Sequence, residues 1–478
     1  EVEQMNLFKD MVCYQEEVRD SSRMAEVLNR VIEKAIRGSA PAQINVPRDM
    51  WTQVIDIELP AIIRVERPSG GEQAIKKAAK LLSKAKFPVI LSGAGVILAD
   101  AIEDTRILAE KLDAPVACGY QHNDSFPGSH PLAVGPLGYN GSKAAMEIIS
   151  KADVVLALGT RLNPFSTLPG YGIDYWPKEA SIIQVDINTD RIGLAKKISV
   201  GICGDAKLVA QQILANLSSS AGDANREERK ALIHQTKSAW LQTLTSLDHE
   251  EDDPGTTWNK DSREKDPDRM SPRMAWRAIQ AGLPKDAIIS SDIGNNCAIG
   301  NAYPIFEKGR KYLAPGLFGP CGYGFPSILG AKIGCPNTPV VGFAGDGAFG
   351  ISMSEMTSCN RKEWPNITMV IFRNYQWGAE KRNSILWYDN NFIGTELDPE
   401  LSYAKIAEAC GFKGVLVRTS DELTHAIKTG CEEQQKGITT FIEVILNQEL
   451  GEPFRRDAMK KPVEVAGINS SDMQSSFI

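Results

Sequence analysis

The sequence predicts an α/β protein made of successive domains with open parallel sheets. Between residues 70 and 215, helix-like segments alternate with apolar strand-like segments such as "PVILSGAGV", "ADVVLALGT" and "SIIQVDIN". This alternation is typical of a parallel sheet with helices on its faces. Farther along, residues 339–380 read as a strand, a tight turn, a helix, a second strand and a polar loop. That order is one βαβ unit, so a second parallel sheet is expected there.

Composition limits the classes of function. The 478 residues are enough for about three domains of ordinary size. A net charge of −7 argues against a general attraction to nucleic acid or to acidic membranes. No apolar run approaches the roughly 20 residues that span a bilayer. The nine cysteines are scattered without a C-x-x-C pair, which favours neither a zinc site nor a disulfide framework and suits a reducing cytoplasm.

The order of these patterns predicts five segments. They are the end of a first domain at 1–60, a central domain at 61–215, a connecting segment at 216–270, a third domain at 271–446 and a tail at 447–478. One helix is expected at 23–36 and another near 228–247. Ser271 followed by Pro272 is typical of a helix start and opens the third domain. The chain begins without methionine and without a recognisable domain start, so we expect an amino-terminally truncated chain.

The βαβ unit at 339–380 carries the clearest candidate site. Val340 to Ala344 is apolar without alternation, as in a strand buried on both faces. A helix with Ile351, Met353, Met356 and Thr357 on one face is expected to follow, and then a strand at 367–372. Asp346 and Asn374 are 374 − 346 = 28 positions apart, about the length of one βαβ unit. A right-handed crossover therefore brings both side chains to the carboxyl ends of neighbouring strands.

Such a pair of oxygen ligands suits a divalent cation. A carboxylate and an amide oxygen are hard ligands that favour Mg²⁺ and leave positions for phosphate oxygens. Gly345 and Gly347 allow the backbone to approach an anion, and Ala348 lies at the start of a helix, where an anion is favoured. A metal with a diphosphate fits best, although Gly-Asp-Gly taken alone is more often a plain turn.

At these residues the chain resembles the thiamine diphosphate enzymes, whose signature is Gly-Asp-Gly followed by Asn a little under thirty residues later. The resemblance covers nearly all of the chain, through segments such as "SDIGNNCAIGNAYP" and "FGPCGYGFPS". It implies the open parallel-sheet domains of that family, thiamine diphosphate and Mg²⁺ as cofactors, and a homodimer or homotetramer. It also implies that sulfoacetaldehyde and phosphate are converted into acetyl phosphate and sulfite.

The resemblance also implies which residues form the site. Cofactor-binding residues are expected at Gly294, Asn295, Asn296, Gly319, Cys321, Gly345, Asp346, Gly347, Ala348, Asn374, Trp377 and Gly378. Asp346, Asn374 and the backbone carbonyl of Gln376 are the expected metal ligands. Relatives commonly have a large apolar residue where this chain has Cys321, so the support of the bent cofactor stays open; a buried core thiol is the alternative. The family's activating glutamate belongs to a part upstream of these residues.

A sulfonate and a phosphate beside a diphosphate require basic donors. Arg161, Arg455 and Arg456 are candidates because the guanidinium fork matches tetrahedral oxyanions, and Lys381 is the next candidate. Arg455 and Arg456 either form a basic lid or belong to an ordinary terminus. His122 either shuttles a proton or is an ordinary loop histidine. The resemblance places Glu380 near the mouth of the site.

Two other functions stay open at this point. One is a 2-oxo acid ligase or decarboxylase of the acetolactate synthase type, and the other is a cofactor-binding scaffold without turnover. The pattern Gly93-x-Gly95 hints at nucleotide binding in the central domain, but it lacks the third glycine and favours a structural turn.

Overall fold

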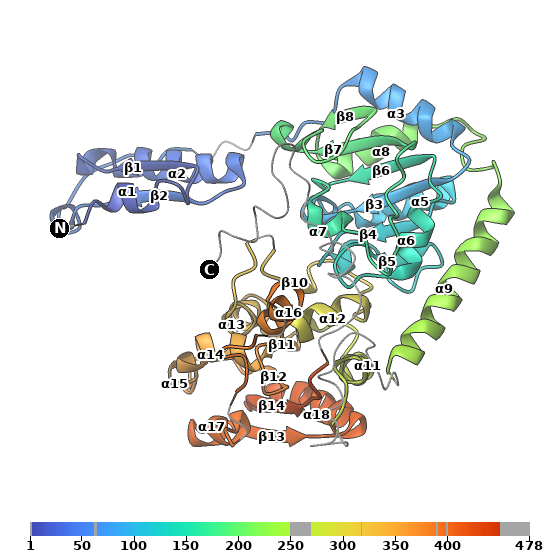
Figure 1. Cartoon of the computed structure of the whole chain (residues 1–478). Coiled ribbons are helices and arrows are strands. Elements are labelled where there is room, and N and C mark those ends of the chain that lie inside the picture. The colour runs from blue at the N-terminus through green and yellow to red at the C-terminus, as the bar shows by residue number, and fades with distance from the viewer. Residues whose placement is uncertain are drawn as a thin grey trace. The chain divides into compact units, whose positions relative to one another are not determined.

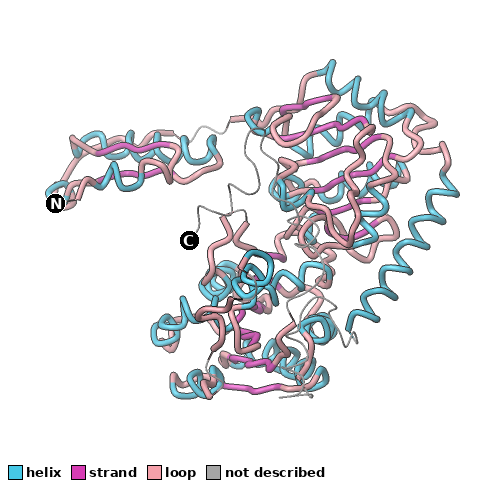
Figure 2. Tube along the Cα trace, in the orientation of Figure 1, coloured by secondary structure: helices cyan, strands magenta, loops and turns pink. Residues whose placement is uncertain are grey.

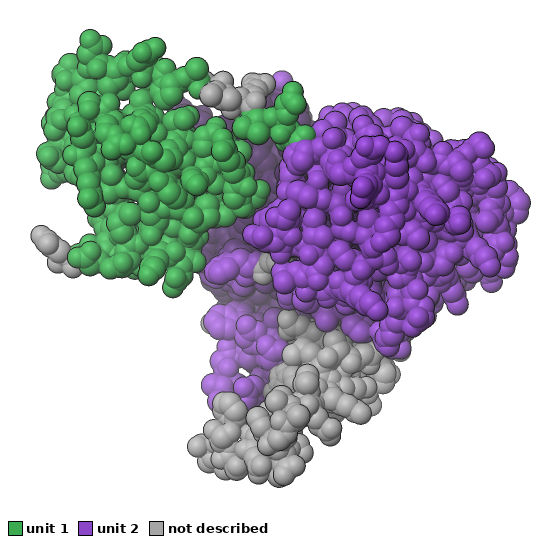
Figure 3. Space-filling model, turned by 90° about the horizontal axis from the view of Figure 1, so that it is seen from above, with its two compact units in different colours: residues 1–67 green, residues 68–478 purple. Residues whose placement is uncertain are grey.

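The computed structural model describes residues 2–61, 65–248, 269–316, 318–388, 391–397 and 400–449. Contacts divide the chain into two compact units, residues 1–67 and residues 68–478 (Figure 3). The second unit contains two six-stranded sheets, in which every pair of neighbouring strands is parallel. Figure 2 shows the strands of these sheets side by side with helices around them.

Residues 1–67 form one small α/β layer. Its elements are α1 (Gln4–Phe8), β1 (Tyr14–Glu17), a 3-10 turn (Ser21–Arg23), α2 (Met24–Gly38), β2 (Ala42–Asn45) and a 3-10 turn (Arg48–Met50). The helix expected at 23–36 is confirmed as α2. Its Val27 and Val31 pack with Val18, whereas Leu28 and Ile32 are exposed. Two strands cover only a narrow strip of the helix, so part of the predicted apolar face has no partner within this unit.

The central sheet has the strand order β5-β4-β3-β6-β7-β8. Its strands are β3 (Pro88–Ser92), β4 (Val116–Cys118), β5 (Ala133–Pro136), β6 (Val154–Leu158), β7 (Ser181–Asp186) and β8 (Val200–Cys203). Its helical segments are α3 (Glu72–Lys84), α4 (Ala94–Leu98), α5 (Ile102–Leu112), a 3-10 turn (Asn123–Ser125), α6 (Lys143–Ile149), α7 (Pro164–Thr167), a 3-10 turn (Thr189–Arg191) and α8 (Ala206–Asn216). Every residue of β3 and β6 is buried, as their continuous apolar runs predict for strands covered on both faces.

A long helix, α9 (Arg226–Asp248), follows the central sheet. The helix α11 (Pro272–Gly282) then opens the third part of the chain, and the predicted start is confirmed because the Ser271 hydroxyl accepts a hydrogen bond from the Met274 amide and Pro272 occupies the first turn. The central part also contacts the third part directly. Asn123 Nδ2 donates to the Asn301 carbonyl at 2.8 Å, and Asp124 Oδ2 accepts from the Lys311 amide at 2.9 Å.

The third sheet has the strand order β10-β9-β11-β12-β14-β13 (Figure 1). Its strands are β9 (Ile288–Ser291), β10 (Tyr312–Leu313), β11 (Val340–Gly345), β12 (Thr368–Arg373), β13 (Lys413–Val417) and β14 (Thr440–Ile445). Its further helical segments are α12 (Asn295–Ile299), a 3-10 turn (Gly300–Ala302), α13 (Gly324–Gly334), α14 (Asp346–Ser352), a 3-10 turn (Met353–Glu355), α15 (Met356–Cys359), α16 (Gly378–Trp387), α17 (Tyr403–Ala409), α18 (Ser420–Glu433) and a 3-10 turn (Gln434–Lys436).

Successive residues of the third sheet enter two different cores. Phe343 and Phe372 pack with Trp276 of α11 and with residues of α18, whereas Ala344 and Ile371 pack with residues of α13, α14 and α17. Side chains of a strand alternate between its two faces, so a strand with two apolar faces shows no polar alternation in sequence. The sheet is therefore held between two helical layers, and its carboxyl edge is left for a site.

The helix expected after Gly347 is interrupted. It is divided into α14, a 3-10 turn and α15, and it ends at Cys359. The change from 3.6 to about 3 residues per turn shifts the phase of the helix. Met356 is consequently buried while Ile351 and Thr357 are exposed, so the prediction of one continuous apolar face was wrong.

Candidate active site

The carboxyl ends of β9, β11 and β12 surround a cavity of about 280 Å³. In an open parallel sheet, ligands bind at this edge because the loops that follow the strands converge there. Thirteen of the residues expected from sequence line the cavity. They are Gly294, Asn295, Asn296, Cys321, Gly345, Asp346, Gly347, Ala348, Asn374, Gln376, Trp377, Gly378 and Glu380.

Asp346 is the first residue of α14 and lies at the end of β11. Its carboxylate is buried, and it accepts hydrogen bonds from the amides of Gly347 at 2.9 Å and Tyr375 at 3.2 Å. Burial raises the pKa of Asp346 to about 7, against the opposing effect of these backbone bonds and of Arg373. A buried carboxylate with a raised pKa lacks a full countercharge, which a bound cation would supply.

Two side-chain amide oxygens in the same cavity lining as this carboxylate have no hydrogen-bond partner among the described residues. They are Asn374 Oδ1 and Gln376 Oε1, and both are buried. The amide nitrogen of Gln376 is used, because it donates to the Gln448 carbonyl at 2.9 Å. Buried polar atoms are normally paired, so unpaired oxygens that line a cavity with a carboxylate indicate a cation site. The hypothesis from spacing that Asp346 and Asn374 converge therefore agrees with the structure.

The turn into α12, which also lines the cavity, supplies groups for an anion. Gly294 has a φ of 128°, a conformation that other residues rarely adopt, and it begins the turn into α12. Asn295 Nδ2 is buried and has no hydrogen-bond partner within the described part of the chain. The turn is held from below by Trp276, whose Nε1 donates to the Asn296 carbonyl at 2.6 Å. An amide donor is thus presented to the cavity by a rigid support.

The glycine-rich segment before α13 is fastened to β9 by a buried carboxylate. Asp292 accepts hydrogen bonds from the amides of Gly322 at 3.1 Å and Gly324 at 2.6 Å. This attachment holds Cys321 at the cavity, where its thiol is exposed rather than part of a core. Gly319 is not among the lining residues, but a Cβ at this position would lie 3.6 Å from the Cδ1 atom of Ile293, which does line the cavity.

Trp377 and Glu380 lie at the rim. Both are exposed, and both line the cavity. A Cβ on Gly347 would lie 2.8 Å from the Trp377 ring, so the glycine is needed for the close approach of these two loops. Sequence reasoning did not assign Ile293, Cys297, Ile351 or Ala379 to the cavity. These residues are apolar or small and have no polar group that would single them out in the sequence, so the fold reveals them.

Lys381 lies outside this cavity. Its side chain is fully buried, and its ammonium group forms an ion pair with Glu396. The structure therefore does not bring Lys381 to the position expected of an anion donor, because α16 directs Glu380 rather than Lys381 to the rim. Arg455 and Arg456 lie outside the described residues.

His122 and Arg161 lie in loops of the central sheet and do not line the cavity. Burial, with a smaller contribution from Arg161, lowers the pKa of His122 to about 4. The imidazole is therefore neutral at pH 7, which does not favour a proton shuttle near neutral pH. Burial, together with the neighbouring Arg191, also lowers the pKa of Arg161.

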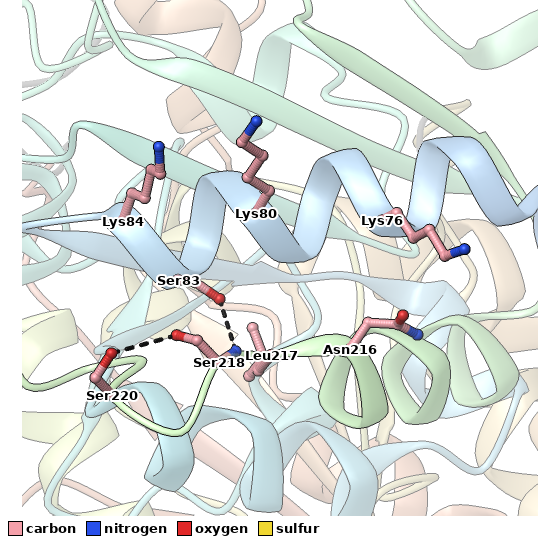
Figure 4. Close-up of a pocket in the computed structure, with 8 residues that line it drawn as sticks. All are labelled: Lys76, Lys80, Ser83, Lys84, Asn216, Leu217, Ser218 and Ser220. Carbon is pink, nitrogen blue, oxygen red and sulfur yellow. Dashed lines mark hydrogen bonds between the residues drawn. The ribbon is translucent and has the colours of Figure 1, made fainter.

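A second cavity, of about 470 Å³, lies between α3 and the segment after α8. Lys76, Lys80 and Lys84 line one side of it (Figure 4). Lys76 pairs with Glu72, and Figure 4 shows the ammonium groups of Lys80 and Lys84 directed away from Ser83 and Ser218. These charges do not converge on one point, so this cavity is a weaker candidate than the one at Asp346.

No group of three or more histidine, cysteine, aspartate or glutamate residues among the described residues is placed to hold a metal. The oxygen set at Asp346 has a single carboxylate, so it is a site for a hard cation that also takes ligands from a bound molecule. None of the helices in the described ranges is long and apolar enough to cross a membrane.

Comparisons with known proteins agree with this geometry. Residues 75–213 match the model of the thiamine pyrophosphate enzyme central domain, and residues 292–444 match that of the C-terminal TPP binding domain of the same enzymes. A probable sulfoacetaldehyde acetyltransferase of Rhizobium meliloti is 76% identical over 99% of this chain and 80% of its own length.

Two further relatives define the range of similarity. A sulfoacetaldehyde acetyltransferase of Roseovarius nubinhibens is 75% identical over 100% of this chain and 79% of its own length. A probable acetolactate synthase large subunit of Methanocaldococcus jannaschii is 30% identical over 97% of this chain and 74% of its own length. The similarity is therefore much higher to the acetyltransferases than to this acetolactate synthase.

Proposed function

This chain belongs to the sulfoacetaldehyde acetyltransferase family of thiamine pyrophosphate (thiamine diphosphate) enzymes, and we propose that it converts sulfoacetaldehyde and phosphate into acetyl phosphate and sulfite. The observation that carries the proposal is the set of oxygens at the cavity, formed by the buried Asp346 carboxylate and the unpaired side-chain oxygens of Asn374 and Gln376. This set fits Mg²⁺ that is shared with a diphosphate. The side-chain oxygen of Gln376 thereby replaces, as the proposed ligand, the backbone carbonyl that the resemblance implies.

The residues around the cavity fit a metal-bound diphosphate cofactor. Asp346, Asn374 and Gln376 would hold Mg²⁺. Gly294, Asn295 and Asn296 would bind the diphosphate, together with the first turn of α14 at Gly345, Gly347 and Ala348. Gly319, Cys321, Trp377 and Gly378 would contact the ring system. Thiamine diphosphate supplies the carbanion chemistry when it is bound, and the protein supplies binding, orientation and electrostatics.

The negative charge of the substrates requires basic groups at the site. No lysine or arginine of the described ranges lines the cavity, whereas Asp346 and Glu380 both do. A sulfonate or phosphate that enters beside a diphosphate is costly unless basic groups meet it. Arg455 and Arg456 are therefore the first proposed anion donors. Arg161 and Lys381 are weaker candidates for the same role. Glu380 is proposed to act at the rim as a proton-accepting or orienting group.

A homodimer, alone or within a homotetramer, is part of the proposal. Large apolar side chains are exposed at and near the rim, among them Phe318, Ile351 and Trp377. Exposed apolar groups around a site mark an interaction surface, and a symmetric second copy is the commonest occupant. The same copy would exclude water from the cavity.

We also propose the domain limits given above and a cytoplasmic location. The two family models fall inside the limits 61–215 and 271–446. All nine cysteines are free, which suits a reducing compartment.

Product analysis tests the proposed reaction. The chain is incubated with thiamine diphosphate, Mg²⁺, sulfoacetaldehyde and phosphate, and sulfite and acetyl phosphate are measured together. We expect the two products in equal amounts and neither without phosphate. A parallel incubation supplies pyruvate in place of sulfoacetaldehyde. Consumption of pyruvate there, without sulfite release from sulfoacetaldehyde, would instead favour the acetolactate synthase type of reaction, and cofactor binding without either reaction would favour a scaffold.

A further inference from the structure

Tyr375 lies between the two residues whose amide oxygens line the cavity. Its backbone has a φ of 58°, in the left-handed region that a bulky residue rarely adopts. Its amide donates to Asp346 Oδ2 at 3.2 Å, and its carbonyl accepts from the Leu397 amide at 2.9 Å. The backbone of this one residue thus connects the carboxylate of the cation site to the segment that follows α16.

The left-handed conformation has a geometric consequence. Asn374 and Gln376 both line the cavity, whereas Tyr375 between them does not. A non-glycine residue keeps such a conformation only when its surroundings hold it there. The contacts of the Tyr375 side chain therefore influence the direction of the Asn374 and Gln376 side chains.

Two guanidinium groups lie over the Tyr375 ring. The central carbon of Arg269 is 4.3 Å from the ring centroid, and that of Arg373 is 4.6 Å from it. Both distances are within the range of a cation–π interaction. The ring is thus held by residues from two different parts of the chain, one before α11 and one at the end of β12.

Arg373 is itself fixed by a buried ion pair. Its guanidinium pairs with Glu443 at 2.5 Å, and the side chains of both residues are almost completely buried. The other Glu443 oxygen accepts hydrogen bonds from Ser402 Oγ at 2.7 Å and the Ala404 amide at 2.9 Å. Arg373 is therefore a rigid support, because its ion-pair partner Glu443 is itself buried in the third sheet and held by two further hydrogen bonds.

We propose that Tyr375 is a positioning residue of the divalent-cation site. The ring, held by Arg269 and Arg373, keeps the Tyr375 backbone left-handed, and this conformation directs the side-chain oxygens of Asn374 and Gln376 toward Asp346. The proposal rests on the cation site of the proposed function and adds a residue that does not touch the cation.

Mn²⁺ titration tests the proposal without relying on turnover. Free Mn²⁺ is measured by electron paramagnetic resonance at saturating thiamine diphosphate for the parent chain, Tyr375→Leu and Tyr375→Phe. Leucine has no aromatic face, so Tyr375→Leu should weaken Mn²⁺ binding by about tenfold or more, while Tyr375→Phe should stay within about twofold of the parent. Near-ultraviolet circular dichroism checks that each variant is folded.

The contrary outcomes are distinct. Tyr375→Leu with an affinity within about twofold of the parent overturns the proposal. If Tyr375→Leu does not fold, Arg269→Gln is measured instead. About threefold weaker Mn²⁺ binding is expected for Arg269→Gln, and unchanged Mn²⁺ binding would contradict the proposal that the two arginines hold the ring. Asp346→Ala separates this proposal from the one it rests on, because Mn²⁺ binding that survives in Asp346→Ala rejects the cation site itself.

Discussion

The fold strongly shifts the pKa values of some single ionisable residues. His122 is an example, because burial lowers its pKa to about 4 from 6.5. Between these two pH values the unfolded chain binds a proton that the folded chain does not bind. Stability therefore falls as the pH is lowered from 6.5 to 4, by on the order of 3 kcal/mol in total.

We expect His122→Gln to flatten this part of the stability curve. The free energy of unfolding is measured by urea titration at several pH values between 4 and 7. His234→Gln, at an exposed position of α9, is the control for the loss of an imidazole. The same slope in His122→Gln and in the parent chain would show that His122 is not held neutral by the fold.

At the scale of residues, the sequence predicted members of the site only where they belong to a motif. The spacing of Asp346 and Asn374 was sufficient to predict that they meet, because one βαβ unit separates them. The burial of Lys381 and the contact of Arg269 with Tyr375 could not be predicted. Both depend on how distant segments pack, and the sequence near these residues contains no periodic signal for it.

Among the elements, α9 makes its most extensive set of hydrogen bonds to the central part of the chain through a buried arginine, Arg229. Arg229 donates to the carbonyls of Asp113, Lys86, Ala224, Leu112 and Gly222 at distances between 2.7 and 3.1 Å. Leu112 ends α5, where a cation is also favoured by the helix dipole. All five donors of the guanidinium are thus used by backbone acceptors.

Arg229→Met should detach α9 from this position. It leaves several buried carbonyls without a donor, so we expect a loss of about 3–5 kcal/mol in the free energy of unfolding. Arg226→Met, at a half-exposed neighbour, is the matched control and should cost about 1 kcal/mol or less. Denaturant titration of both variants compares them, and equal losses would contradict the special role of Arg229.

Strands were easier to predict than helices at the scale of elements. The apolar runs that became β3, β6, β11 and β12 are buried on both faces, so their sequence signal is strong. The half-exposed strand β13 has a weak signal and was not predicted. The interrupted helix after Gly347 was misplaced because a 3-10 turn changes the period on which the prediction relied.

The whole molecule is expected to work as a symmetric assembly. Sedimentation velocity should give at least a dimer, because Phe318, Ile351 and Trp377 are exposed near a site that must exclude water. Ile351→Lys places a charge at this surface and should weaken the assembly, whereas Leu98→Lys, at an exposed position of α4, is the control. An active monomer would contradict this part of the account.

Calorimetric titration of thiamine diphosphate tests the central claim most directly. The claim is that the cavity at Asp346 binds the cofactor through a divalent cation held by Asp346, Asn374 and Gln376. The account predicts saturable binding with Mg²⁺ present, and losses of about a hundredfold or more when Mg²⁺ is removed or when Asp346 or Asn374 is changed to alanine. Thiamine diphosphate that binds equally well to the parent chain and to both variants, with or without Mg²⁺, would contradict it.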